Sequence, residues 1–404
     1  MLIYILLLFA FIGIYLIGKF FIKDEKKRQL FCSLCPAILL FLLLSLKASS
    51  VGADSQTYVN AYYAIGGMHK FPSREFFTDL NHFNFKNEYG FIFFSQLFNM
   101  VKLPYLAMQV FVYAVICFSL FYSVYKLSRC PVFSFIIFYC FTFFNFFVSG
   151  LRQSFAISLC LLALTLIISG GKTVWRTVVF FSLITIAALW HKSAIIFFLA
   201  YFIIRIRVNL KMFIVLIFIS LFLLLFAEQM YQFINSFSGL LFNTKVADYA
   251  PFSAGNGLTN ILFIGIILFC FFISYPSKIK TKLGITLSEK IKFFNVEDSV
   301  VYSREIQEDF TLLDNFSFML LMTFVGLWLR YTNLYSVAFG RVSIYFSIFV
   351  IFLLPNSVEN IRNFKIKGVL KIILFIAFAG YFAYTVIRTN YLAIAPYKFL
   401  EGTI

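Results

Sequence analysis

The fold is decided by two apolar runs that follow one another in the chain, VFSFIIFYCFTFFNFFVS (residues 132–149) and RQSFAISLCLLALTLIIS (residues 152–169). Each is close to the ~20 residues that a helix needs to cross the hydrocarbon core of a bilayer. The apolar residues are nearly continuous, whereas an amphipathic helix on a soluble core would show them on one face only. The two runs therefore predict a pair of membrane-spanning helices.

Runs of this kind recur along the whole chain. Of its 404 residues, 62% are hydrophobic and 13% are charged, against roughly half and a quarter in soluble domains. This composition excludes an ordinary soluble enzyme, a disordered protein and a secreted disulfide scaffold. The apolar residues suffice for about 12 spans, so we predict an all-α fold, a polytopic transmembrane helical bundle. The predicted spans are 2–22, 31–48, 104–126, 132–149, 152–169, 174–190, 193–207, 211–227, 258–276, 311–329, 336–354 and 369–388.

The charge balance indicates topology rather than a nucleic-acid partner. The chain has 34 Lys and Arg against 17 Asp and Glu, a net charge of +17. The basic residues lie mostly in short loops, which is typical of cytoplasmic loops in membrane proteins. The sequence has no polar domain with a stripe of basic and aromatic residues, which is the pattern that would predict nucleic-acid binding. The first dense cluster, Lys23–Arg28, places the loop after the first span inside and the N-terminus outside.

The segments between the spans give the predicted domain organisation. Residues 89–101 (YGFIFFSQLFNMV) are apolar but short for a span. We interpret them as a re-entrant or interfacial helix that dips into the membrane within an outer region, 49–103. A second outer loop covers 228–257, and a cytoplasmic loop covers 277–310. The whole chain, 1–404, is predicted to form a single integral membrane domain.

Several ionisable residues are expected at the outer end or within the outer half of a span, where a charge is costly and usually functional. A guanidinium group suits phosphate and carboxylate, so the group predicts an anion site near the outer leaflet. The alternative for a single arginine is an ion pair with one of the carboxylates that locks the bundle. The residues are Asp54, Glu88, Arg152, His191, Arg330 and Arg341.

Motifs for nucleotides and metals are missing from the sequence. It contains no P-loop, GxGxxG or HExxH, no GxSxG, and no Asp-x-Asp pair. Cys32 and Cys35 have no second Cys or His pair, and His69 and His82 lack a matched ligand set. We therefore predict no metal and no cofactor. An enzyme of this kind would use a donor that is already activated, and we expect it to be carried on a lipid.

Short motifs in order along the chain resemble the EpsG/Wzy-type polysaccharide polymerases, the bacterial membrane polymerases of O-antigen and exopolysaccharide repeat units. The resemblance covers about residues 50–400. Its motifs are Gly52-x-Asp54-x-x-x-Tyr58, Glu88-Tyr89-Gly90-Phe91, Leu151-Arg152-Gln153-Ser154-Phe155-Ala156, Trp190-His191-Lys192-Ser193-Ala194, Arg341-Val-Ser-Ile-Tyr345-Phe and Ala395-Pro396-Tyr397-Lys398-Phe399.

This resemblance implies a GT-C-like membrane glycosyltransferase of lipopolysaccharide or exopolysaccharide biosynthesis, which the missing metal motifs predict to be metal-independent. It would transfer a growing glycan from undecaprenyl diphosphate to a lipid-linked repeat unit. The active site would face the periplasm or exterior from the bacterial cytoplasmic (inner) membrane. The implied partners are undecaprenyl-diphosphate-linked oligosaccharides, membrane lipid and a chain-length regulator.

The expected roles follow from the charge that grows on a departing diphosphate. Arg152 and Arg341 would bind the diphosphate, with Arg330 and Lys398 as helpers. The acceptor hydroxyl needs a general base, and the candidates are His191, Glu88 and Asp54, with His191 or Glu88 preferred. Candidate substrate contacts are Tyr58, Gln153, Tyr345 and Tyr397, although tyrosines at a membrane interface also serve packing.

Three other functions compete with a polymerase. An O-antigen ligase-like transferase would use the same donor and attach the glycan to the lipid A core. A transporter or flippase of the lipid-linked oligosaccharide should carry charges through both leaflets, whereas here they gather on the outer side. A membrane acyltransferase would need an intramembrane His near a cytoplasmic donor site, which is missing.

Overall fold

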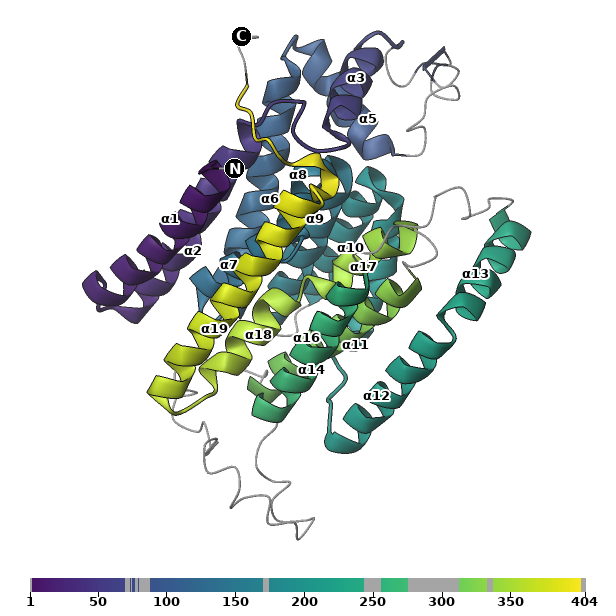
Figure 1. Ribbon diagram of the computed structural model, residues 1–404. Helices are drawn as coiled ribbons and strands as arrows, with labels where there is room; N and C mark the ends of the chain where they lie inside the picture. Colours follow the sequence, from purple (N-terminus) through teal and green to yellow (C-terminus); the bar gives the residue numbers. More distant parts are fainter. Residues whose placement is uncertain are drawn as a thin grey trace. The chain divides into compact units, whose positions relative to one another are not determined.

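The protein is helical throughout the part of the chain that is described. The computed structural model describes residues 2–69, 73, 75–76, 79, 88–169, 174–242, 256–274, 312–332 and 337–400. Within these residues Figure 1 shows helices, and the only β pairing is an isolated antiparallel bridge between Lys47 and Phe399. The all-α prediction is confirmed for these ranges.

The helices group into two compact units. The first unit comprises Met1–Phe198 and Leu374–Ile404, and the second comprises Leu199–Ile373. The chain passes between them twice. The first crossing is at the end of the 3₁₀ helix Lys192–Leu199 (η1), and the second is within the helix Phe364–Ala383 (α19).

The first unit contains most of the long helices of the N-terminal half (Figure 1). At its centre, α9 packs against α6 and α10, and almost all of its side chains are buried. The elements are α1 (Leu2–Phe21), α2 (Glu25–Ser45), α3 (Ser55–Gly66), α5 (Tyr89–Met100), α6 (Tyr105–Leu127), α7 (Pro131–Cys140), α8 (Phe143–Ser149), α9 (Leu151–Ile168), α10 (Val174–Trp190), η1 (Lys192–Leu199), the end of α19, η4 (Tyr384–Arg388) and η5 (Tyr391–Ala393).

The second unit is built around α16, which packs against α12, α14, α17 and α18. Gly326 on α16 allows the contact with α17, because a Cβ there would lie 2.5 Å from the backbone nitrogen of Ser347. The elements are α11 (Ala200–Ile203), α12 (Leu210–Leu225), α13 (Ala227–Phe242), α14 (Asn256–Ser274), α16 (Leu312–Tyr331), α17 (Val337–Ser347), α18 (Val350–Glu359) and the start of α19 (Phe364–Ala383).

Six helices of the described chain are long and apolar enough to cross a membrane, and eight if each of two bent pairs counts as one span. The expected number of about twelve spans and the GT-C-like architecture are not confirmed. The predicted span 132–149 is two helices, α7 and α8, which meet at 65°. The break lies at Thr142, whose φ of 67° is left-handed and stops the helix. The predicted span 193–207 holds η1 and the four-residue α11.

The predicted loops differ in how much helix the structure places in them. Helix α5 covers most of 89–101, where we expected a short membrane-dipping helix. Helix α13 covers the first part of the predicted outer loop 228–257. The predicted cytoplasmic loop 277–310 lies outside the described residues. The sidedness of these loops and the single domain 1–404 stay predictions.

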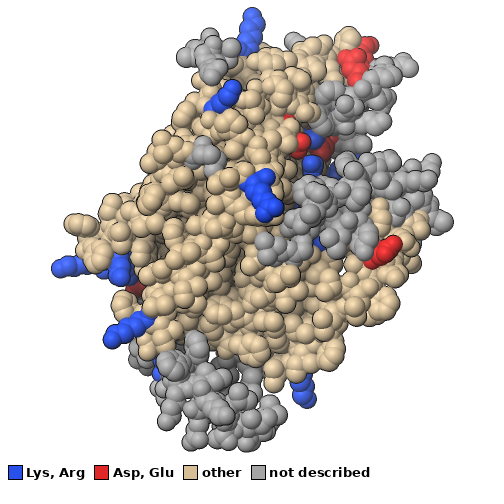
Figure 2. All heavy atoms as spheres, viewed as in Figure 1, with Lys and Arg blue, Asp and Glu red and all other residues tan. Residues whose placement is uncertain are grey.

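Large apolar side chains are exposed along the outward faces of several helices. In the view of Figure 2, most of the described surface carries neither Lys or Arg nor Asp or Glu. Exposed apolar surface of this extent is what a bilayer covers in a membrane protein. Examples are Phe9 and Phe20 on α1, Phe218, Phe222 and Leu225 on α12, and Ile372 and Ile376 on α19.

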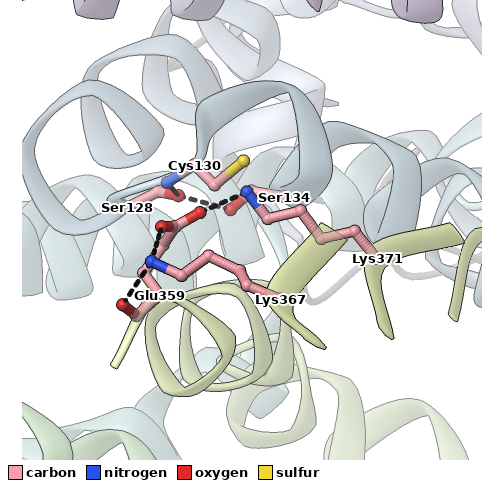
Figure 3. A network of polar contacts seen from close by, with 6 residues as sticks. All are labelled: Ser128, Cys130, Ser134, Glu359, Lys367 and Lys371. Carbon is pink, nitrogen blue, oxygen red and sulfur yellow. Dashed lines mark hydrogen bonds and ion pairs between the residues drawn. The ribbon is translucent and has the colours of Figure 1, made fainter. Parts of the chain in front are cut away.

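Two polar clusters fix helix turns in the two units, and Figure 3 draws both. In the second unit, Glu359 at the end of α18 pairs with Lys371 and with Lys367, whose Nζ lies 3.0 Å from Oε2, which ties α18 to the first turns of α19. In the first unit, the Ser128 hydroxyl accepts from the Ser134 hydroxyl at 2.7 Å, which closes the turn between α6 and α7.

Candidate active site

One carboxylate in the first unit joins two of the predicted site residues. Glu88 lies at the N-cap of α5, and its Oε1 is 2.7 Å from Nδ1 of His191. Its Oε2 accepts from Nη1 of Arg152. The side chains of Glu88, Arg152 and His191 are 12%, 13% and 25% exposed. We call these three residues the Glu88 cluster; the Arg152–Glu88 pair that the sequence offered as an alternative is present in it.

Each member of the Glu88 cluster is placed by a helix end. Helix α8 stops at Ser149, and Gly150 separates it from α9, so Arg152 lies in the first turn of α9. His191 follows directly on the last residue of α10. The positive end of the helix dipole at the start of α9 adds to the charge of Arg152 and favours a carboxylate or phosphate nearby.

Gly90 allows the start of α5 to touch the end of α10. A Cβ on Gly90 would lie 2.6 Å from Cδ1 of Trp190 and 3.0 Å from the backbone carbon of Leu189. Any side chain larger than hydrogen would therefore push the two helices apart. This contact holds Glu88, two residues before Gly90, beside His191, one residue after Trp190.

Aromatic rings form the floor of the Glu88 cluster. The guanidinium carbon of Arg152 is 5.2 Å from the centre of the Tyr58 ring and 5.6 Å from that of Phe91. Trp190 is fully buried and its ring centre is 4.0 Å from that of Phe155. Cation–π contacts hold the arginine in place, and apolar surroundings strengthen the attraction between its charge and that of Glu88.

The turn before α3 carries Asp54 to the end of α8. The backbone N–H of Asp54 donates to Oγ of Ser149 at 3.2 Å. Gly52 makes the turn possible, because its φ is +100° and a Cβ there would lie 3.0 Å from the carbonyl oxygen of Val148. Asp54 occupies the N-cap position of α3 and Tyr58 lies in the next turn. The turn that carries Asp54 is therefore hydrogen-bonded to Ser149, three residues before Arg152 in the chain.

Residues 391–399, the C-terminal segment, also bind the turn that carries Asp54, through backbone hydrogen bonds. The backbone N–H groups of Gly52 and Ala53 donate to the carbonyl oxygens of Ala393 and Leu392 at 3.0 and 2.9 Å. This segment contains two of the predicted residues. Tyr397 donates its hydroxyl to the carbonyl oxygen of Leu43 at 2.7 Å, and the carbonyl oxygen of Lys398 accepts from Ala48 at 2.9 Å. The side chain of Lys398 is exposed.

The remaining predicted residues lie elsewhere. Gln153 is buried in the first turn of α9, next to Arg152. Arg330, Arg341 and Tyr345 belong to the second unit. There, Nε of Arg330 donates to Oδ1 of Asn260 at 3.3 Å, and Tyr345 is only 1% exposed. The prediction that Arg330, Arg341 and Tyr345 contribute to the site is not tested by these contacts.

Sequence reasoning missed Lys47, which is buried beneath the turn that carries Asp54. Its ammonium donates to the carbonyl oxygen of Val51 at 3.0 Å and to Oγ of Ser55 at 2.6 Å. Burial lowers the pKa of Lys47 from 10.5 to about 7. The signal in the sequence is a lysine that ends an apolar run and precedes a Ser- and Gly-containing turn, a pattern that also suits an ordinary interfacial anchor.

The chemistry available at the Glu88 cluster combines a cation, a carboxylate and an imidazole on one apolar floor. Within the described ranges, no group of three His, Cys, Asp or Glu side chains could hold a metal ion. The arrangement can bind an anion through Arg152 and can accept a proton through His191 or a carboxylate.

These features define an all-helical membrane protein with a partly buried ion cluster at the ends of its helices. The family model described as the EpsG family matches residues 30–399, and the chain belongs to this family. It is therefore a polysaccharide-polymerase-like membrane protein. No curated protein and no solved structure matches the chain. The matched range contains all the predicted site residues.

Proposed function

We propose that this protein is an O-antigen or exopolysaccharide polymerase. It transfers a growing glycan from undecaprenyl diphosphate to a lipid-linked repeat unit at the outer face of the bacterial cytoplasmic membrane. The observation that carries the proposal is the Glu88 cluster, in which Arg152, Glu88 and His191 meet on an aromatic floor within a chain of the EpsG family.

The proposed reaction needs a cation and a base. An acceptor hydroxyl attacks the anomeric carbon of the donor, a new C–O bond forms, and the bond to the diphosphate breaks. Negative charge grows on the leaving diphosphate, and cations fixed in apolar surroundings stabilise it. Arg152 takes this role, with Arg341, Arg330 and Lys398 as further candidates. The hydroxyl proton passes to a base, for which His191, Glu88 and Asp54 are the candidates.

The donor is already activated by its diphosphate, so the proposed reaction requires neither nucleotide nor metal. Tyr58 and Gln153 flank Arg152 and are the nearer candidates for contacts with sugar or phosphate. Membrane lipid surrounds the helices, and a separate chain-length regulator is the expected protein partner.

Synthesis of a glycan ladder by the purified protein tests the proposal. The protein is placed in lipid nanodiscs with lipid-diphosphate-linked repeat units extracted from cells of the same strain that lack it. EDTA is present, nucleotide is absent, and products are separated on a gel. We expect a ladder from the wild type and from Arg205→Ala, a control at an exposed arginine outside the cluster, and none from Arg152→Ala.

The failures of this test point to different functions. Donor binding without a ladder would contradict the polymerase. It would then favour a ligase that lacks its lipid A core acceptor, or a transporter. A ladder that requires a divalent metal would overturn the metal-independent mechanism while leaving the polymerase in place. Full activity of Arg152→Ala would remove Arg152 from the site.

A further inference from the structure

The contacts of Glu88 divide the roles of the candidate bases; this inference rests on the proposed function. Both carboxylate oxygens of Glu88 are engaged, Oε1 with Nδ1 of His191 and Oε2 with Nη1 of Arg152. A general base must reach the proton that it accepts. Each oxygen therefore already uses one of its two acceptor sites, and a substrate hydroxyl at Glu88 would have to share the carboxylate with His191 and Arg152.

The contact with Glu88 also sets the tautomer of His191. A carboxylate paired with an arginine is an acceptor only, so the nitrogen that faces it must carry a hydrogen. Nδ1 of neutral His191 is therefore the N–H, and the lone pair lies on Nε2. Because the side chain of His191 is 25% exposed, about twice the fraction of Glu88 at 12%, His191 is the member of the pair more open to a substrate.

We propose that Glu88 is a positioning residue and that Nε2 of His191 is the atom that takes the proton of the acceptor hydroxyl. Glu88 fixes the ring and its tautomer through Oε1. Arg152 holds Oε2 and so keeps the carboxylate oriented towards His191. The fork of N–H donors on its guanidinium suits phosphate, and Arg152 stays the proposed contact of the diphosphate.

The proton and electron balance of the step is closed by these groups. The acceptor oxygen gives its proton to Nε2 of His191 as its lone pair forms the bond to the anomeric carbon. The electrons of the broken C–O bond leave with the diphosphate. The resulting imidazolium donates from Nδ1 to Glu88 and is stabilised by its charge. The proton then passes to water, and the imidazole returns to its starting form.

The tautomer of His191 can be measured without any substrate. The chain has three histidines, His69, His82 and His191, so a His69→Gln, His82→Gln double variant leaves one imidazole to observe. The protein, labelled with ¹⁵N-histidine, is placed in nanodiscs at a pH where the ring is neutral. We expect the nitrogen spectrum of an Nδ1–H ring. Glu88→Ala should remove this preference, and Glu228→Ala, at an exposed glutamate on α13, should not.

An Nε2–H ring in the otherwise unchanged protein would overturn the proposal, whatever the protein's activity. This readout stands apart from the ladder assay, so an inactive protein with an Nδ1–H His191 would contradict the proposed function and leave this geometry intact. Because the spectrum of the parent protein decides the question, the result does not depend on whether the Glu88 variants fold.

Conservative variants separate a positioning residue from a base in the ladder assay. The amide oxygen of Glu88→Gln can still accept from Nδ1 but cannot serve as a base. We expect Glu88→Gln to retain at least tenfold more activity than Glu88→Ala, and His191→Gln to lose about 10²–10⁴-fold. Adding Glu88→Ala to His191→Gln should cost little more, since both changes disable one unit.

The opposite pattern would identify Glu88 as the base. In that case Glu88→Gln would be as inactive as Glu88→Ala, while His191→Gln would retain activity. If Asp54→Asn alone abolished the ladder and His191→Gln did not, the base would be Asp54. Either result contradicts the roles proposed for Glu88 and His191.

Discussion

At the scale of single residues, Lys47 shows how burial alone can make a charge costly. It is 2% exposed, and its hydrogen bonds go to a carbonyl and a hydroxyl. Among the ion pairs of the described residues, none joins a carboxylate to it. Desolvation disfavours the charged amine, which is why its pKa falls to about 7.

We predict that Lys47 makes the stability of the protein rise with pH. The pKa is about 7 in the folded state and 10.5 otherwise, so the unfolded chain binds more protons between these values. The cost is present in full below about pH 7 and is relieved as the pH rises towards 10. Lys47→Met should remove this slope and raise stability at pH 7 by about 2–5 kcal/mol. Thermal unfolding in detergent across this pH range measures it.

The control for this prediction is Lys211→Met, which removes a charge of the same sign from an exposed site at the start of α12. It should leave the pH slope of the unfolding temperature unchanged. Equal slopes for the wild type and Lys47→Met would show that the amine does not titrate in this range.

The residues of the Glu88 cluster could be predicted from the sequence, but their grouping could not. A glutamate, an arginine and a histidine near helix ends were recognisable from the cost of placing charges there. Their grouping depends on contacts between segments 64 and 103 residues apart in the chain. The sequence therefore offered Glu88 and His191 as equal candidates, and the contact between them is what supports the different roles proposed for them.

At the scale of elements, the contact between α5 and α10 depends on Gly90. We predict that Gly90→Ala lowers both stability and activity, because the new Cβ would meet the ring of Trp190 and the backbone of Leu189 at 2.6 and 3.0 Å. Overpacking of this kind costs about 1–3 kcal/mol. The helix ends would separate, and Glu88 would move away from His191. Thermal unfolding and the His191 tautomer spectrum measure the two effects.

Gly13→Ala is the matched control, since a Cβ at that position meets nothing within 4 Å. It should be neutral or slightly stabilising, because alanine favours a helix more than glycine does. A Gly90→Ala protein with wild-type stability and an unchanged tautomer would show that α5 and α10 are not in close contact.

The C-terminal segment is the second element on which the site depends. It accepts hydrogen bonds from the backbone of Ala48, Gly52 and Ala53. We predict that ending the chain at residue 389 speeds amide hydrogen exchange at these three positions and lowers ladder synthesis, because the turn before α3 loses its partners. Ending the chain at residue 400 retains all three bonds and should change neither. Unchanged exchange after the longer truncation would contradict this role.

Elements with continuous apolar sequence were the ones that could be predicted well. The predicted spans 2–22, 104–126 and 152–169 correspond to Leu2–Phe21, Tyr105–Leu127 and Leu151–Ile168. Helix α2 begins at Glu25, before the predicted 31, because Asp24 caps it by accepting from the N–H of Lys27. Hydropathy detects the lipid-facing part of a helix, not its polar first turns, nor a break such as Thr142.

At the scale of the whole molecule, the proposed function depends on which side of the membrane the Glu88 cluster faces. The basic loops predict that Lys23–Arg28 is cytoplasmic, so the turn at His191 should be outside. We predict that Lys192→Cys and Lys102→Cys react with a membrane-impermeant maleimide on intact cells and that Lys26→Cys reacts only after permeabilisation. All three lysines are exposed, and six of the seven native cysteines are buried, so background labelling should be low.

Labelling of residue 192 only after permeabilisation would put the cluster beside cytoplasmic nucleotide sugars. A polymerase that uses an outer-leaflet lipid donor would then be excluded, even though the contacts within the cluster would be unchanged.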